Sequence, residues 1–159
     1  MRNSREVIYN ALLALIQQVL GGMNPPLLTV SRVWRPHTDY SLPQLPAAVL
    51  DEKKEAAGAK DWGAPALYHL YVDLWLYFAA PVQSQIPGQE STIPMTAVNN
   101  AIDLLENGPL ANPPGVPAQT LGGLVQRVYI EGDILKAVST GSSQQNYSLA
   151  RVPLVIFTT

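Results

Sequence analysis

Apolar residues at helical spacing occur in two stretches of the chain. From Val7 to Leu20 they form two adjacent rows at i,i+4, which predicts a helix with one broad apolar face. Asn3 and Glu6 have the spacing of a capping box at its start. The stretch from about Met95 to Asn107 repeats the helical spacing. The sequence therefore predicts two amphipathic helices, each with one face to bury.

The strongest strand pattern alternates from Tyr68 to Ala80. One set of side chains is purely aliphatic or Phe and predicts a core face. The other set is polar and aromatic: His69, Tyr71, Asp73, Trp75 and Tyr77. Further strands are predicted for Leu28–Trp34, Leu45–Leu50, Leu124–Ile130, Ile134–Val138 and Tyr147–Thr158, with an interruption at Gly132.

Prolines and charges modify this assignment in three places. Pro46 restricts its strand to an edge or places it at the strand's beginning, and Pro153 predicts an edge position or a bulge, because proline cannot donate to a ladder. The mixed-charge run from Asp51 to Glu55 predicts a solvated turn. Short strands joined by turns indicate an antiparallel arrangement.

We therefore expect a single domain over residues 1–159 with an α+β fold. Its sheet is predicted to be mostly antiparallel, with the two helices packed on one face. The opposite face then meets water or a partner.

Composition narrows the possible functions. Hydrophobic residues make up 47% of the chain and charged residues only 14%, which hints at surface buried in an assembly. A net charge of −2 without a basic cluster argues against sequence-specific nucleic-acid binding. The chain has no cysteine, so disulfides and thiolate chemistry are excluded. No stretch is typical of a membrane span or a secretory signal.

Residues that could carry catalysis are few and scattered. His37 and His69 do not have metal-ligand spacing. Glu131 and Asp133 flank Gly132 and could share a face, but solvated charges at a turn are the more common explanation. No phosphate-binding loop or nucleophile elbow occurs. We expect no enzymatic activity, no cofactor and no metal site.

The polar and aromatic face of the long strand is the most informative feature. Tyr and Trp combine apolar area with a polar tip, which suits protein interfaces. We expect this face, formed by the five residues from His69 to Tyr77 given above, to lie against a neighbouring subunit. The alternatives are an exposed aromatic face, or a loop folded across it.

The order and spacing of these segments resemble those of the tail terminator (tail completion) proteins of long-tailed bacteriophages. The likeness covers most of the chain. It is carried by the first helix Asn3–Leu20, the long strand from Tyr68 to Leu76, the helix Ala97–Leu105, the segment from Thr120 to Val125 with Ile130-Glu131-Gly132, and the closing Ala150–Ile156.

The resemblance implies a ring, usually a hexamer, at the head-proximal end of the virion tail and assembled in the host cytoplasm. Such a ring caps the tail tube, stops its polymerisation and meets the head connector, without an active site. Loops at the rims would contact tube and connector and could order only on docking. The candidate loops are Arg35–Pro43, Pro81–Pro94 and Pro109–Pro117, represented by Arg35, His37, Asp39, Gln85, Gln89, Pro113 and Pro114.

Two other classes of function remain open. One is a different virion part, either a head-closure or neck protein or a tail tube subunit. The other is a small-molecule-binding or enzymatic α+β domain, for which the chain offers only Glu131, Asp133, His37 and Asp73 as polar groups.

Overall fold

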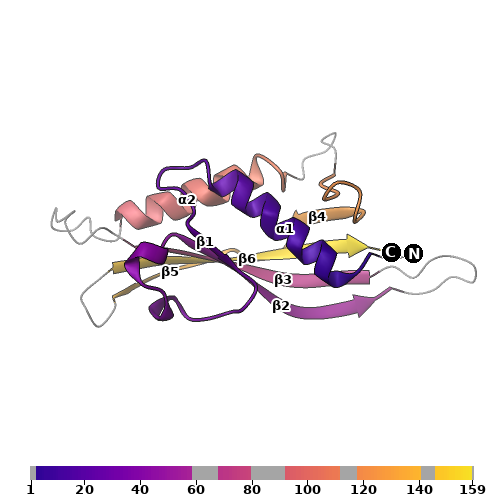
Figure 1. The fold of residues 1–159 in the computed structure, drawn as a ribbon, viewed down its shortest axis with the longest axis horizontal. Coiled ribbons are helices and arrows are strands. Elements are labelled where there is room, and N and C mark those ends of the chain that lie inside the picture. Colours follow the sequence, from indigo (N-terminus) through magenta and orange to yellow (C-terminus); the bar gives the residue numbers. More distant parts are fainter. Residues whose placement is uncertain (1–2, 59–67, 80–91, 112–117, 141–145, 159) are drawn as a thin grey trace, which may run out of the picture.

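The computed structural model describes residues 3–58, 68–79, 92–111, 118–140 and 146–158. Within these ranges, two α-helices and a six-stranded mixed sheet confirm the predicted α+β class (Figure 1). The strand order is β1-β2-β3-β6-β4, and β5 pairs with β6 beside β4. The bounds are α1 (Arg5–Leu20), β1 (Thr29–Ser31), β2 (Ala47–Ala57), β3 (Tyr68–Ala79), α2 (Thr92–Glu106), β4 (Arg127–Ile130), β5 (Leu135–Thr140) and β6 (Asn146–Thr158).

Helix α1 begins one residue later than the sequence predicts. The hydroxyl of Ser4 is the cap and accepts a hydrogen bond from the Val7 amide at 3.3 Å. Asn3, the predicted cap, instead donates its side-chain amide to the carbonyl of Leu124 at 2.8 Å. One of the two predicted apolar rows of α1 is fully buried: Ile8, Leu12, Ile16 and Leu20. The adjacent row is not, because Val7 is 47% exposed and the rest of that row is only partly buried.

Both helices cover one face of the sheet (Figure 1). The aliphatic and Phe side chains of β3 point into this layer and are at most 1% exposed: Leu70, Val72, Leu74, Leu76 and Phe78. They join the buried faces of α1 and α2 in one cluster. This core lies on the helix side of the sheet. The opposite side, here called the second face, receives no cover from α1 or α2.

Strand β2 corrects two expectations. It is longer than predicted and carries the charged run from Asp51 to Glu55 within the strand, where a solvated turn was expected. The charges are accommodated because β1 pairs only with Ala47–Val49, so the rest of β2 forms an edge where side chains reach solvent. Glu55 also pairs with Arg5 of α1. In addition, β1 runs parallel to β2, so the sheet is not wholly antiparallel.

Strand β6 is interior although it contains Pro153. It pairs with β3 on one side and with β4 and β5 on the other. Pro153 lies opposite the break between β4 and β5, where the Glu131 amide donates to its carbonyl at 3.1 Å. Gly132 has φ 109° here, and a Cβ at this position would lie 3.3 Å from Cγ of Pro153. Of the two predicted alternatives, the edge position is wrong. The irregular segment at Gly132, between β4 and β5, accommodates the proline.

Candidate functional site

The second face of the sheet carries the residues that the sequence singled out. His69, Tyr71, Asp73, Trp75 and Tyr77 of β3 alternate with the core residues, as predicted. The register of β6 adds further side chains to this face, opposite those residues in turn: Phe157, Val155, Pro153, Arg151 and Leu149. The two ends of the face differ in what covers them.

At one end the chain covers its own second face. Residues 32–45, here called the flap, run from β1 back to the start of β2 and contain two 3-10 turns, η1 (His37–Asp39) and η2 (Leu42–Gln44). The flap lies on the side of the sheet opposite the helices (Figure 1). The hydroxyl of Tyr77 donates to the flap carbonyl of Arg35 at 2.9 Å, and Tyr77 is only 1% exposed.

Aromatic rings fill the space beneath the flap. The ring of Tyr40 lies 5.7 Å from that of Tyr77, and His37 lies 4.9 Å from Tyr147, between centroids. Trp34 meets Trp75 edge to face at 6.1 Å. Tyr40, Tyr77 and Tyr147 belong to a second hydrophobic cluster. At this end the folded-loop alternative is therefore correct.

Burial by the flap removes Tyr77 from the predicted subunit interface, because the chain's own atoms already cover it. Trp75 remains half-buried. Burial also raises the pKa of Tyr77 and lowers the pKa of His37. Within the described residues, Nε2 of His37, the Tyr40 hydroxyl and Nε1 of Trp75 are buried without a hydrogen-bond partner.

The structure places the predicted docking residues in different surroundings. Arg35 and Asp39 are exposed on the flap, while His37 packs beneath it. The guanidinium of Arg35 lies 4.9 Å from the centre of the Tyr40 ring. The flap is thus packed against the sheet by contacts within the chain itself. The remaining docking residues lie outside the described residues: Gln85, Gln89, Pro113 and Pro114.

The other end of the second face, here called the open end, is not covered by any residue in the described ranges. Its aromatic patch consists of His69, Tyr71, Tyr129, Val155 and Phe157. The register places Tyr71 and Tyr129 on either side of Val155, and His69 opposite Phe157. The rings of His69 and Phe157 lie 4.4 Å apart. The four ring side chains are half-buried, whereas Val155 is the buried floor between them.

Two exposed cations lie on the aromatic patch. Nζ of Lys54 is 4.9 Å from the centre of the Tyr71 ring, and the guanidinium of Arg127 is 5.0 Å from that of Tyr129. Neither cation forms an ion pair with any described residue. No sequence pattern singled out these two cations, Tyr129 or Phe157. Alternation within the last strands could have placed them on one face, but only the register brings them beside Tyr71.

Between the two ends, Asp73 lies among charged neighbours. Nε of Arg151 is 3.9 Å from its carboxylate, and Lys53 pairs with Asp51 at 2.6 Å. Burial raises the pKa of Asp73, while the nearby Arg151 and Lys53 oppose that rise. Nε of Arg151 is buried and has no hydrogen-bond partner among the described residues. The charges around Asp73 are therefore only partly paired with one another.

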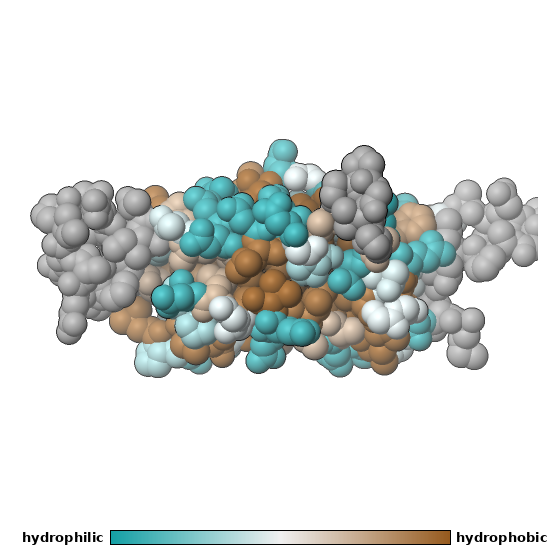
Figure 2. All heavy atoms as spheres, turned by 90° about the horizontal axis from the view of Figure 1, so that it is seen from above, coloured by the Kyte–Doolittle hydropathy of each residue, from teal (hydrophilic) through white to brown (hydrophobic). Residues whose placement is uncertain are grey.

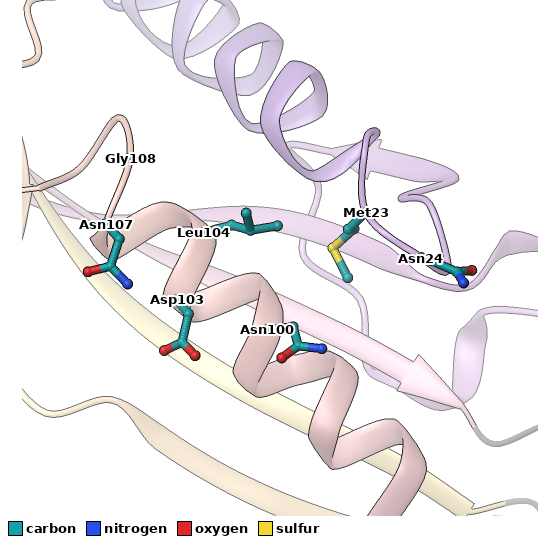
Figure 3. Close-up of a pocket in the computed structure, with 7 residues that line it drawn as sticks. All are labelled: Met23, Asn24, Asn100, Asp103, Leu104, Asn107 and Gly108. Atoms are coloured by element: carbon teal, nitrogen blue, oxygen red, sulfur yellow. The ribbon is translucent and has the colours of Figure 1, made fainter.

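On the helix side, a hollow of about 600 Å³ lies between α2 and the turn after α1 (Figure 3). Met23 and Leu104 give it an apolar part, and Asp103 is its only carboxylate among the described residues. Asn24, Asn100 and Asn107 supply amides. The hollow offers hydrogen bonds and one negative charge, without a nucleophile beside a base.

The candidate catalytic residues do not converge. His37 lies beneath the flap and His69 in the aromatic patch, while Glu131 and Asp133 are exposed at the break between β4 and β5. The described ranges contain no group of three His, Asp or Glu able to hold a metal ion. Neither α1 nor α2 is long and apolar enough to cross a membrane, and no other helix of that kind occurs in the described ranges.

Comparison with models of known protein families and with curated proteins finds no match. The second face is thus the feature from which function is inferred.

Proposed function

We propose that this chain is a structural subunit that binds copies of itself through the aromatic patch and forms a closed ring. The observation that carries the proposal is the half-covered second face: the flap hides one end, and nothing in the described chain hides the other. Half-buried Tyr, Phe and His side chains supply large contact area at low entropic cost. A patch of this kind is typical of a protein interface.

The ring we propose is the tail terminator of a long-tailed bacteriophage, at the head-proximal end of the virion tail. It would cap the tail tube, end its polymerisation and join the tail to the head connector. The element order α1, β1 to β3, α2, β4 to β6 supports this, because the resemblance depends on that order. A ring of identical subunits needs two different contact surfaces on each subunit, related by a rotation that closes.

Electron microscopy of the purified chain, alone and mixed with polymerising tail tube protein, tests the proposal. A terminator gives closed rings of one size and shortens the tubes by capping them. Long polymers of the chain itself would indicate a tube subunit, and rings that bind the connector without shortening tubes would indicate a neck protein. Single chains at every concentration, with no effect on tubes, would contradict the proposal.

A matched pair of substitutions locates the contact. Tyr71→Glu places a charge in the aromatic patch, whereas Val7→Glu places the same charge at an apolar side chain of α1 that is 47% exposed. We expect Tyr71→Glu to abolish rings and Val7→Glu to leave them intact. Rings that survive Tyr71→Glu would show that the patch is not the contact.

A further inference from the structure

We propose that the aromatic patch of one subunit binds the outward face of α2 on the next copy of this chain. The inference rests on the proposed ring and names the surface that fills the patch. The two surfaces lie on opposite sides of the molecule, since α2 covers the first face and the patch belongs to the second (Figure 1). They also carry opposite charges.

The patch contributes positive charge. Lys54 and Arg127 are both exposed, and each lies over a tyrosine ring without a carboxylate partner in the described chain. Other cations near the strands are already used: Arg5 pairs with Glu55, and Arg32 pairs with Glu6 at 2.6 Å. Glu131 also borders the patch, through a hydrogen bond between its carboxylate and Tyr129. With two cations and this one carboxylate, the patch keeps an excess of positive charge.

The outward face of α2 contributes negative charge. Asp103 and Glu106 are exposed, have no ion-pair partner among the described residues, and lie on a helix with no basic residue in its last turn. Carboxylates there face the negative end of the helix dipole, which is unfavourable for the helix alone. A cation brought by a partner would offset both the carboxylates and the dipole.

The spacing of the patch tyrosines and an exposed leucine on α2 both fit a contact between the patch and α2. Tyr71 and Tyr129 are separated by two strand spacings, about 10 Å, and a helix with its side chains is about 10 Å across. Val155 is the floor between the tyrosines. Leu104, 42% exposed beside Asp103, offers apolar area on α2. The hollow next to it has room for a protruding side chain (Figure 3).

Seen from the helix side, exposed hydrophobic side chains lie between hydrophilic ones in the middle of the molecule (Figure 2). A surface of this mixed kind suits an interface with an apolar centre and a charged rim. Because the patch and α2 are different surfaces, the contact is heterologous and propagates from copy to copy until it closes. A two-fold dimer would instead place patch against patch.

Charge reversal tests the contact. One variant combines Lys54→Glu and Arg127→Glu, and the other combines Asp103→Lys and Glu106→Lys. We expect each variant alone to lose ring assembly, measured by light scattering, because both of its surfaces then carry the same sign. Mixed in equal amounts, the two variants should assemble as alternating copies, and a chain with all four changes should assemble by itself.

Controls separate this inference from the ring itself. Arg35→Glu and Asp39→Lys reverse exposed flap charges and should leave assembly unchanged, and circular dichroism checks that every variant is folded. A wild-type chain that stays single overturns the ring and this contact together. Two outcomes would overturn only the contact with α2 and point to another occupant of the patch. In the first, rings still form in both charge-reversal variants. In the second, ring assembly is lost in both variants, and neither the mixture nor the fourfold variant restores it.

Discussion

The two ends of the second face are built from similar residues but have different neighbours. Tyr77 at the covered end and Tyr71 at the open end lie on the same strand and point the same way. The flap buries Tyr77, whose hydroxyl donates a hydrogen bond to the Arg35 carbonyl. Tyr71 stays half-exposed beneath Lys54. Aromatic residues on a sheet face thus stabilise the fold at one end and remain available to a partner at the other.

The largest expected difference is in stability. Tyr77→Ala removes a buried ring and should lower the free energy of unfolding by about 3–5 kcal/mol. Tyr71→Ala should lower it by only about 1 kcal/mol, because the ring is half-exposed. Urea denaturation of the two variants measures both values. Similar losses would mean that the two ends do not differ in the way described.

At the covered end, we expect a smaller difference in stability between two Tyr→Phe variants. Tyr77→Phe removes the hydrogen bond to the Arg35 carbonyl and should cost about 1 kcal/mol. Tyr40→Phe should cost nothing, because the buried Tyr40 hydroxyl has no partner among the described residues. Thermal unfolding, compared through the midpoint temperatures, distinguishes the two. A loss in Tyr40→Phe equal to that in Tyr77→Phe would contradict the assigned hydrogen bonding.

On the helix side we expect stability and assembly to change in opposite directions. In a single-chain background such as Tyr71→Glu, Glu106→Gln should raise the free energy of unfolding by about 0.3–1 kcal/mol, because it removes a carboxylate from the C-terminal turn of α2. In the wild-type background it should weaken assembly. Glu6→Gln is the control: Glu6 lies in the first turn of α1 and pairs with Arg32, so its loss should destabilise the fold.

The smallest expected change concerns pH. The lowered pKa of His37 favours its neutral form in the folded chain, while the unfolded chain takes up a proton below about pH 6.5. Stability should therefore fall as the pH drops below about 6.5, and His37→Gln should reduce that fall. Urea midpoints at pH 7.5 and pH 5.5 measure it. An unchanged pH dependence in the variant would exclude His37 as a source.

The sequence predicted what each segment does locally but not which segments meet. Periodicity located both helices and assigned Tyr71 and Tyr77 to one strand face. It could not show that the flap folds back over Tyr77, because that packing depends on Tyr40 and His37, far away along the chain.

The remaining differences between the predicted and the observed strands come from strand register, which the sequence patterns did not predict. The charged run Asp51–Glu55 continues β2 because β3 pairs with it, and its charges alone indicated a turn. Pro153 is tolerated in an interior strand only because the break at Gly132 lies opposite. The pairing of Tyr129 with Val155 likewise comes from register, so the full aromatic patch was visible only in the structure.

The association state of the chain tests the central claim most directly. Sedimentation equilibrium over a wide concentration range should give wild-type chain a mass that is a multiple of 17.2 kDa, and Tyr71→Glu the mass of a single chain. Wild-type chain that remains at 17.2 kDa throughout, or Tyr71→Glu that associates as wild type does, would contradict self-assembly through the open end of the second face.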